Sequence, residues 1–182
     1  PGGPCDFSAD PRVGIIVSQY IHDTHHAQLG GMEALDTRYA HDKAIELNET
    51  DYYPTWYRGE PVSCSRVEAW EFIVGGGSSF NQLNGRYTVH DPAGRTEDNA
   101  RVCGALANLL DFMHGFDFVR MRPDPNLMVF GSGIYARGIS EPGRQYAFYL
   151  HHSGPDPRGS YVAVPGSYEV TLVLPMPEGR YT

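Results

Sequence analysis

Short apolar runs alternate with segments of helical periodicity over the first 122 residues, and this alternation constrains the fold more than any other feature. Residues 13–21 and 43–48 are apolar runs of strand length, as expected for strands buried on both faces. Residues 78–84 form a weaker third run. Because strands that alternate with helices usually lie parallel, the pattern predicts a parallel sheet covered by helices.

Each of these runs is followed by a segment that suits a helix. The first helix is expected over residues 29–41. The second begins at Val62 and stops at Gly75-Gly76-Gly77, because glycine favours the end of a helix. Thr96 is a good N-cap for the third, which runs to about His114. Its apolar residues recur at three- and four-residue steps and predict one buried stripe, made of Ala100, Cys103, Leu106, Ala107, Leu110 and Met113.

After Arg122-Pro123 the pattern changes to short strands separated by glycine, proline and serine, without a helix signal. These strands are expected at residues 127–130, 134–137, 145–150 and 169–174. Such a series is typical of antiparallel structure and predicts part of a β-sandwich. The first domain would then span residues 1–122 and the second residues 123–182. Arg120 and Arg122 stand at this boundary, and we expect them to join the two parts through ion pairs, for example with Asp117 or Asp124.

Composition excludes several classes of partner. The chain has 182 residues and a formal net charge of -8, so no basic patch is available to neutralise the phosphates of a nucleic acid. It has no run of about 18 apolar residues that could span a membrane. The three cysteines are widely and irregularly spaced, which gives neither a disulfide framework nor a zinc pattern. No cofactor is expected.

The strand at residues 43–48 leads into a carboxylate, Glu49, and then into an aromatic loop with Tyr52, Trp56 and Tyr57. In barrels of parallel strands, catalytic residues lie at the carboxyl ends of the strands. Aromatic faces stack on sugar rings, and a carboxylate at such a position can attack an anomeric carbon. The pattern therefore suggests a sugar-processing site in which Glu49 could attack or stabilise an anomeric carbon. A capping or surface ion-pair role for Glu49, and rim packing for the aromatic residues, stay open as alternatives.

Two other strand ends offer polar groups. Asn81, near the end of the third strand, could hydrogen-bond sugar hydroxyls or form a turn. His22 follows the first strand and begins a cluster with Asp23, His25 and His26. Contact with substrate is one role for His22, and solvated loop histidines are the plain alternative. Imidazoles and a carboxylate can also bind a metal ion, but no HExxH pattern accompanies them, and we expect no metal.

Four segments resemble a family of cellulase-like (β/α)8-barrel glycoside hydrolases that carry a β-sandwich after the barrel. Two of them resemble the last units of the barrel and two resemble strands of the sandwich: residues 69–83, 109–124, 141–150 and 174–181. The resemblance covers most of the chain from about residue 43, and the order of the segments is more specific than any one of them.

The resemblance implies an α/β fold: the last β/α units of a TIM-type (β/α)8 barrel followed by antiparallel strands of a β-sandwich. Glu49 would end the seventh barrel strand, where retaining enzymes of this architecture keep their nucleophile. The family's acid/base glutamate ends the fourth strand, which has no counterpart here. We therefore expect a fragment of a longer protein that acts on an oligo- or polysaccharide and that associates with itself or with a complementary chain. A carbohydrate-binding or structural module without catalysis is the alternative, and a metal-dependent hydrolase using residues 22–26 is a weaker one.

Overall fold

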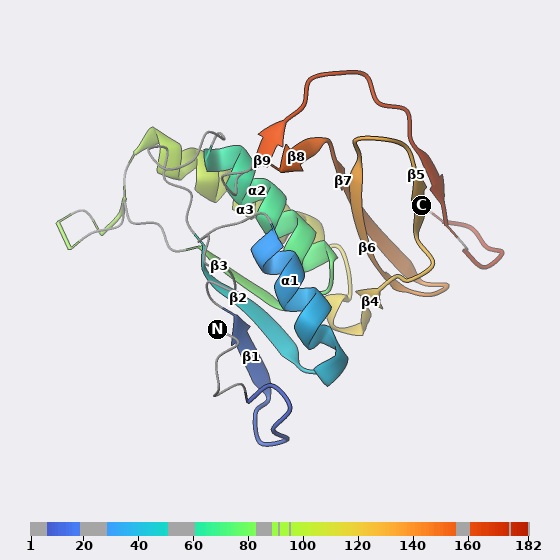
Figure 1. Cartoon of the computed structure of the whole chain (residues 1–182), viewed down its shortest axis with the longest axis horizontal. Coiled ribbons are helices and arrows are strands. Elements are labelled where there is room, and N and C mark those ends of the chain that lie inside the picture. The colour runs from blue at the N-terminus through green and yellow to red at the C-terminus, as the bar shows by residue number, and fades with distance from the viewer. Residues whose placement is uncertain are drawn as a thin grey trace.

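The structure is a computed structural model that describes residues 7–18, 29–50, 61–82, 89–90, 92–94, 96–155, 161–174 and 176–181. A three-stranded parallel sheet has the order β1-β2-β3 and lies at one end of the molecule (Figure 1). Its strands are β1 (Ile15–Ser18), β2 (Ala44–Thr50) and β3 (Ser79–Gln82). The predicted parallel pairing of these three segments is thus confirmed.

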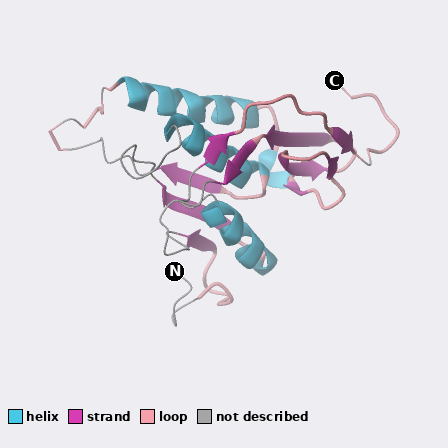
Figure 2. Cartoon of the chain, turned by 45° about the horizontal axis from the view of Figure 1, so that its top comes forward, coloured by secondary structure: helices cyan, strands magenta, loops and turns pink. Residues whose placement is uncertain are grey.

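Helices separate and follow the strands at the predicted places. The bounds are Leu29–Arg38 for α1, Pro61–Val74 for α2 and Glu97–Met113 for α3, with a 3-10 turn, η1, at Tyr39–His41. The two longer helices, α2 and α3, run side by side (Figure 2). The predicted N-cap is confirmed, because the Thr96 side chain accepts a hydrogen bond from the backbone N–H of Asn99 at 3.2 Å.

Glycine ends α2 as predicted. Gly76 has φ +107°, a left-handed conformation that residues with a side chain rarely adopt, and a Cβ there would lie 2.6 Å from Pro123. At Gly77 a Cβ would lie 2.3 Å from the ring of Phe72. The chain can therefore turn sharply from α2 into β3 only because these positions carry no side chain.

One face of the parallel sheet is covered and the other is open. Ile16, Ile45 and Leu47 are buried and face the helices, and Ala34, Leu35 and Phe72 complete this core. On the opposite face, Ile15 is 58% and Val17 is 50% exposed. Successive residues of a strand alternate between faces, so this difference marks a sheet that the described helices cover on one side only.

The second half of the chain forms small antiparallel sheets. β4 (Arg122–Pro123), β6 (Tyr135–Glu141) and β7 (Gln145–His151) make a three-stranded sheet, whereas β5 (Met128–Phe130) pairs only with β10 (Thr171–Val173) and β8 (Ser153–Pro155) only with β9 (Tyr161–Ala163). The predicted TIM-type barrel followed by a β-sandwich is therefore wrong for this chain. Three parallel strands are too few to close a barrel, and the antiparallel strands are divided among separate two- and three-stranded sheets rather than two sheets packed face to face.

Helix α2 links the two halves, because its residues enter both cores. Phe72 packs toward the parallel sheet, whereas Ala69 and Val74 pack with residues from α3 and the β6–β7 hairpin. The other buried members of this second core are Leu109, Met113, Met121, Ile139 and Ala147. The hairpin therefore rests on the same helix that covers the parallel strands.

The predicted stripe of α3 is only partly right. Val102, Leu109 and Met113 are buried, and Leu106 packs against them, but Leu110 is 56% exposed. Ala100, Cys103 and Ala107 are also exposed. The buried stripe is the neighbouring one on the helix surface. It is displaced by one residue because α2 and the β6–β7 hairpin cover only that side.

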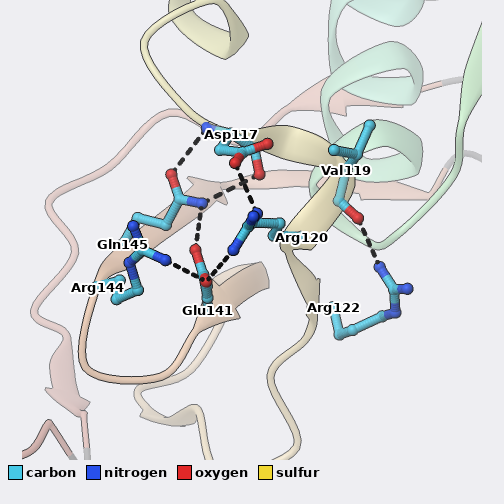
Figure 3. A network of polar contacts seen from close by, with 7 residues as sticks. All are labelled: Asp117, Val119, Arg120, Arg122, Glu141, Arg144 and Gln145. Carbon is cyan, nitrogen blue, oxygen red and sulfur yellow. Dashed lines mark hydrogen bonds and ion pairs between the residues drawn. The ribbon is translucent and has the colours of Figure 1, made fainter.

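A polar network joins the turn after α3 to the β6–β7 hairpin (Figure 3). In this turn, η2 (Phe118–Arg120), the Arg120 side chain lies 2.9 Å from a carboxylate oxygen of Asp117 and 3.7 Å from Glu141. Gln145 donates to the Asp117 carbonyl at 3.0 Å and to Glu141 at 3.0 Å. The predicted ion pairing of Arg120 with Asp117 is confirmed. Arg122 instead donates to the backbone carbonyls of Val119 and Met121.

Candidate functional site

The carboxyl ends of the three parallel strands meet at one edge of the sheet. Glu49 is the next-to-last residue of the middle strand, β2, and Asn81 is the next-to-last residue of β3. Two residues predicted for the site from sequence thus lie on neighbouring strands at the same edge. The strand before Glu49 pairs in parallel with β1 and with β3, which is the arrangement that a strand-end catalytic carboxylate requires.

An irregularity in β2 affects the position of Glu49. Leu47 pairs with Phe80, but Thr50 pairs with Gln82, so three steps along β2 match two along β3. A register shift of one residue is what a β-bulge produces, and bulges are frequent beside active sites. The irregularity lies between Leu47 and Thr50, so it includes the backbone of Glu49.

The open face of the sheet carries polar groups near this edge. Asn81 and Ser79 on β3 are exposed, and Glu46 and Asn48 on β2 are half-buried. Gln82 belongs to the opposite face, where its side chain donates to the Ser65 hydroxyl of α2 at 3.0 Å. Amide, hydroxyl and carboxylate groups together can both donate and accept hydrogen bonds, as binding of a sugar hydroxyl requires.

Several predicted residues lie outside the described part of the chain. These are His22 with the rest of the cluster at residues 22–26, and the aromatic residues Tyr52, Trp56 and Tyr57. Among the described residues, no group of three or more His, Cys, Asp or Glu side chains is arranged to hold a metal ion. None of the described helices has the length and apolar character to cross a membrane.

A second polar cluster, which sequence reasoning missed, is buried between α2 and β7. Glu71 and His151 form a contact of 2.9 Å between Oε1 and Nε2, and each side chain is 6% exposed. Glu68, one turn earlier on α2, is also buried. The two glutamates could have been suspected of having a buried partner, because they lie on the buried side of an apolar helix and carboxylates are rarely buried without one. The partner His151, 80 residues away, could not be identified from sequence.

The hydrogen bonds of His151 define its protonation. The backbone N–H of Ser153 donates to Nδ1 at 3.2 Å, so Nδ1 is the acceptor and carries no proton. The proton therefore lies on Nε2 and points at the Glu71 carboxylate. A neutral imidazole held in one tautomer between a carboxylate and a backbone amide is a structural support for the junction of α2 with β7. Rings of Tyr135 and Tyr149 flank it at centroid distances of 5.2 Å and 5.6 Å.

Tyr149 lies beside this pair and has a perturbed hydroxyl. Burial raises its pKa to about 12, while the charge of Arg66 and a hydrogen bond from it act in the opposite direction and the charge of Glu71 adds to the rise. The ring stacks on Trp70 at 5.2 Å. Tyr149 therefore stays protonated at neutral pH, and its hydroxyl is fixed in place by Arg66.

Comparison of the chain with protein-family profiles, with curated proteins and with solved structures finds no significant match in any of the three. The function must therefore be inferred from the residues and geometry of the chain.

Proposed function

We propose that this chain supplies the nucleophilic carboxylate of a retaining glycoside hydrolase, and that Glu49 is this nucleophile. The observation that carries the proposal is the position of Glu49. It is the next-to-last residue of the middle strand of a parallel sheet, within a register irregularity, and Asn81 is the next-to-last residue of the neighbouring strand. The same position supports the substrate class, because Asn81 is exposed and can hydrogen-bond sugar hydroxyls beside the reacting carbon.

The chemistry requires two carboxyl groups with different roles. A carboxylate oxygen of Glu49 attacks the anomeric carbon, and the bond to the leaving-group oxygen breaks with its electron pair. A carboxylic acid protonates that oxygen and then, as a carboxylate, removes a proton from the water that hydrolyses the glycosyl ester. In retaining enzymes the two carboxyl groups lie about 5–5.5 Å apart.

Glu46 does not meet this distance. It precedes Glu49 by three residues on the same strand, and each strand residue advances the chain by about 3.3 Å, so the two backbone positions are about 10 Å apart. We infer that the acid/base carboxyl comes from a residue outside the described ranges or from a second chain.

The exposed edges and the exposed face of the parallel sheet are consistent with association with a second chain. The outer edges of β1 and β3 have no strand paired to them among the described residues, and unpaired edges are templates for another strand. Ile15 and Val17 expose apolar side chains on the uncovered face. A further apolar cavity of about 660 Å³ lies between β3 and α3 and is lined by Ile73, Phe80, Leu106, Leu110 and Met113 among others. Exposed apolar area of this kind commonly marks an interaction surface.

The nucleophile can be tested without the acid/base group. A 2,4-dinitrophenyl glycoside has a leaving group that departs without protonation, so the attack of Glu49 should release a burst of one equivalent of dinitrophenolate per chain. The burst should be lost in Glu49→Gln and retained in Glu46→Gln, a matched change on the same strand. Gluco-, galacto-, manno- and xylo-configured reagents cover the sugar specificity that the sequence leaves open.

The same experiment distinguishes the proposed hydrolase from the alternative, a carbohydrate-binding module. If the reagents bind without a burst, and Glu49→Gln binds them equally well, the chain is a carbohydrate-binding module without nucleophilic chemistry. A burst that survives Glu49→Gln would assign the nucleophile to another residue and refute the proposal.

A further inference from the structure

A second cavity lies on the opposite side of α2 and α3 from the parallel sheet. It has a volume of about 610 Å³ and opens between the N-terminal halves of these helices and the segment from β7 to β9. This volume is within the range of small-molecule sites, roughly 300–1,000 Å³. Its polar lining residues include Ser63, Arg66, Arg101, Asn108, Tyr149 and His152, and the described His151 and Ser153 also line it.

The charge of the cavity lining opposes that of the whole chain. The chain has 22 Asp and Glu residues against 14 Lys and Arg residues, yet the described lining contains two arginines and neither an aspartate nor a glutamate. The nearby carboxylate of Glu71 accepts a hydrogen bond from His151. A concave site of one charge sign focuses its potential and attracts a ligand of the opposite sign.

The two arginines come from different helices and approach the cavity from two sides. Arg66 lies on α2 and Arg101 on α3. The hydroxyl of Tyr149 is hydrogen-bonded to Arg66, and the Tyr149 ring is held by its stacking on Trp70 at 5.2 Å. Trp70 in turn packs against Phe112 at 5.1 Å. The two arginines can therefore approach one ligand from different helices.

Uncharged hydrogen-bonding groups complete the site. The Nδ1 of His152 is bound to the Val164 carbonyl at 2.9 Å, which fixes the ring and leaves Nε2 as its other hydrogen-bonding atom. Ser63 and Asn108 add a hydroxyl and an amide to the lining. The lining thus combines groups that pair with an oxyanion and groups that pair with hydroxyls.

We propose that this cavity binds a hydroxylated small molecule with a single oxyanion, of the size of a sugar acid or sugar phosphate. The planar guanidinium fork of arginine matches the oxygens of carboxylate and phosphate, and the neutral lining groups take the hydroxyls. Binding there requires no turnover. It does not depend on the proposed hydrolase activity.

Titration calorimetry on the chain tests this with matched ligands. Glucuronate and glucose differ only in the carboxylate at C6, and glucose 6-phosphate offers the other oxyanion. We expect at least one anion to bind about tenfold or more tightly than glucose, since a hydrogen bond to a charged group contributes about 1.5–3 kcal/mol. The anion that binds better identifies the chemistry. Anions that bind no better than glucose would overturn the proposal.

Variants assign the binding to the two arginines. Arg66→Gln and Arg101→Gln should each weaken anion binding about tenfold and leave glucose binding unchanged. Arg144→Gln, on the β6–β7 hairpin away from the cavity, is the matched control and should bind like the unmodified chain. If Arg66→Gln fails to fold because its bond to Tyr149 is lost, Arg101→Gln decides the question. Full anion affinity in Arg101→Gln would refute the assignment of the site.

Discussion

Replacement of His151 should lower the free energy of unfolding strongly, because the buried carboxylate of Glu71 loses a hydrogen-bond donor. The two side chains are each 6% exposed and meet at 2.9 Å, and the second ring nitrogen accepts the Ser153 N–H. His151→Ala removes the imidazole donor from a buried carboxylate, and it also deletes the acceptor for a buried backbone amide. A hydrogen bond to a charged group contributes about 1.5–3 kcal/mol, and the change also leaves a cavity and removes the acceptor of the Ser153 N–H, so we expect a loss of about 4 kcal/mol in the free energy of unfolding.

His151→Ala should lower the free energy of unfolding by less in a variant whose residue 71 carries no charge. In Glu71→Gln the amide oxygen can still accept from Nε2–H, so this variant alone should lose only about 1 kcal/mol. In that background His151→Ala leaves no buried charge behind and should cost about 2 kcal/mol, chiefly for the cavity and the lost hydrogen bonds. The coupling between the two positions is then about 2 kcal/mol, within the range for residues in contact.

Urea denaturation followed by circular dichroism measures all four members of this cycle. The cavity left by His151→Ala is common to both backgrounds and cancels in the cycle, so the coupling reports on the pair. If His151→Ala costs the same in both backgrounds to within about 0.5 kcal/mol, the two side chains are not energetically linked. The buried pair would then not be what fastens α2 to β7.

Three further predictions concern the helix cap at Thr96, the glycine after α2 and the buried hydroxyl of Tyr149. Thr96→Ala removes the side-chain acceptor for the Asn99 N–H and should lower the free energy of unfolding by about 1 kcal/mol. Thr96→Asp keeps an acceptor at this position and should keep the stability of the unmodified chain. Equal losses in the two variants would contradict the role of Thr96 as N-cap. Gly76→Ala places a Cβ 2.6 Å from Pro123 at φ +107° and should lower the free energy of unfolding by more than about 1 kcal/mol. Gly104→Ala lies inside α3, where a Cβ meets nothing within 4 Å, and should be neutral or stabilising in the same urea denaturation; equal effects of the two changes would contradict the account. Tyr149 has a pKa raised to about 12 chiefly by burial, so its contribution to stability is complete below pH 10 and declines as the pH rises from about 10 to 12. Tyr149→Phe should flatten that part of the stability profile, and an unchanged profile would argue that another group titrates there.

The strand and helix order could be predicted because it depends on local patterns. The apolar run at residues 43–48, the cap at Thr96 and the glycines after α2 each determine structure through their immediate neighbours, and all three were placed correctly. The predicted stripe of α3 failed for the opposite reason. Its surface has two adjacent apolar stripes, one through Leu109 and one through Leu110, and only the position of α2 and the β6–β7 hairpin decides which of them is buried.

The wider fold and part of the site depend on distant contacts that sequence patterns do not specify. The short strands after Arg122 were expected to form a sandwich, but strand signals give no pairing partners, and β5, β8 and β10 are in two-stranded sheets. The bulge between Leu47 and Thr50 involves no glycine or proline that could have marked it. Glu71 could be suspected from its place on an apolar helix, but its pairing with His151 is visible only in the folded chain.

The most direct test of the proposed function is the identification of the residue that forms a covalent glycosyl intermediate. A 2-deoxy-2-fluoroglycosyl fluoride reacts with the nucleophile but leaves it slowly, because fluorine at C2 destabilises the oxocarbenium-like transition state. Mass spectrometry of the digested protein should then find one added fluorosugar, located on the peptide that contains Glu49. An adduct on Glu46 or another residue, or no adduct with any sugar configuration, would contradict the assignment of Glu49 as a catalytic nucleophile.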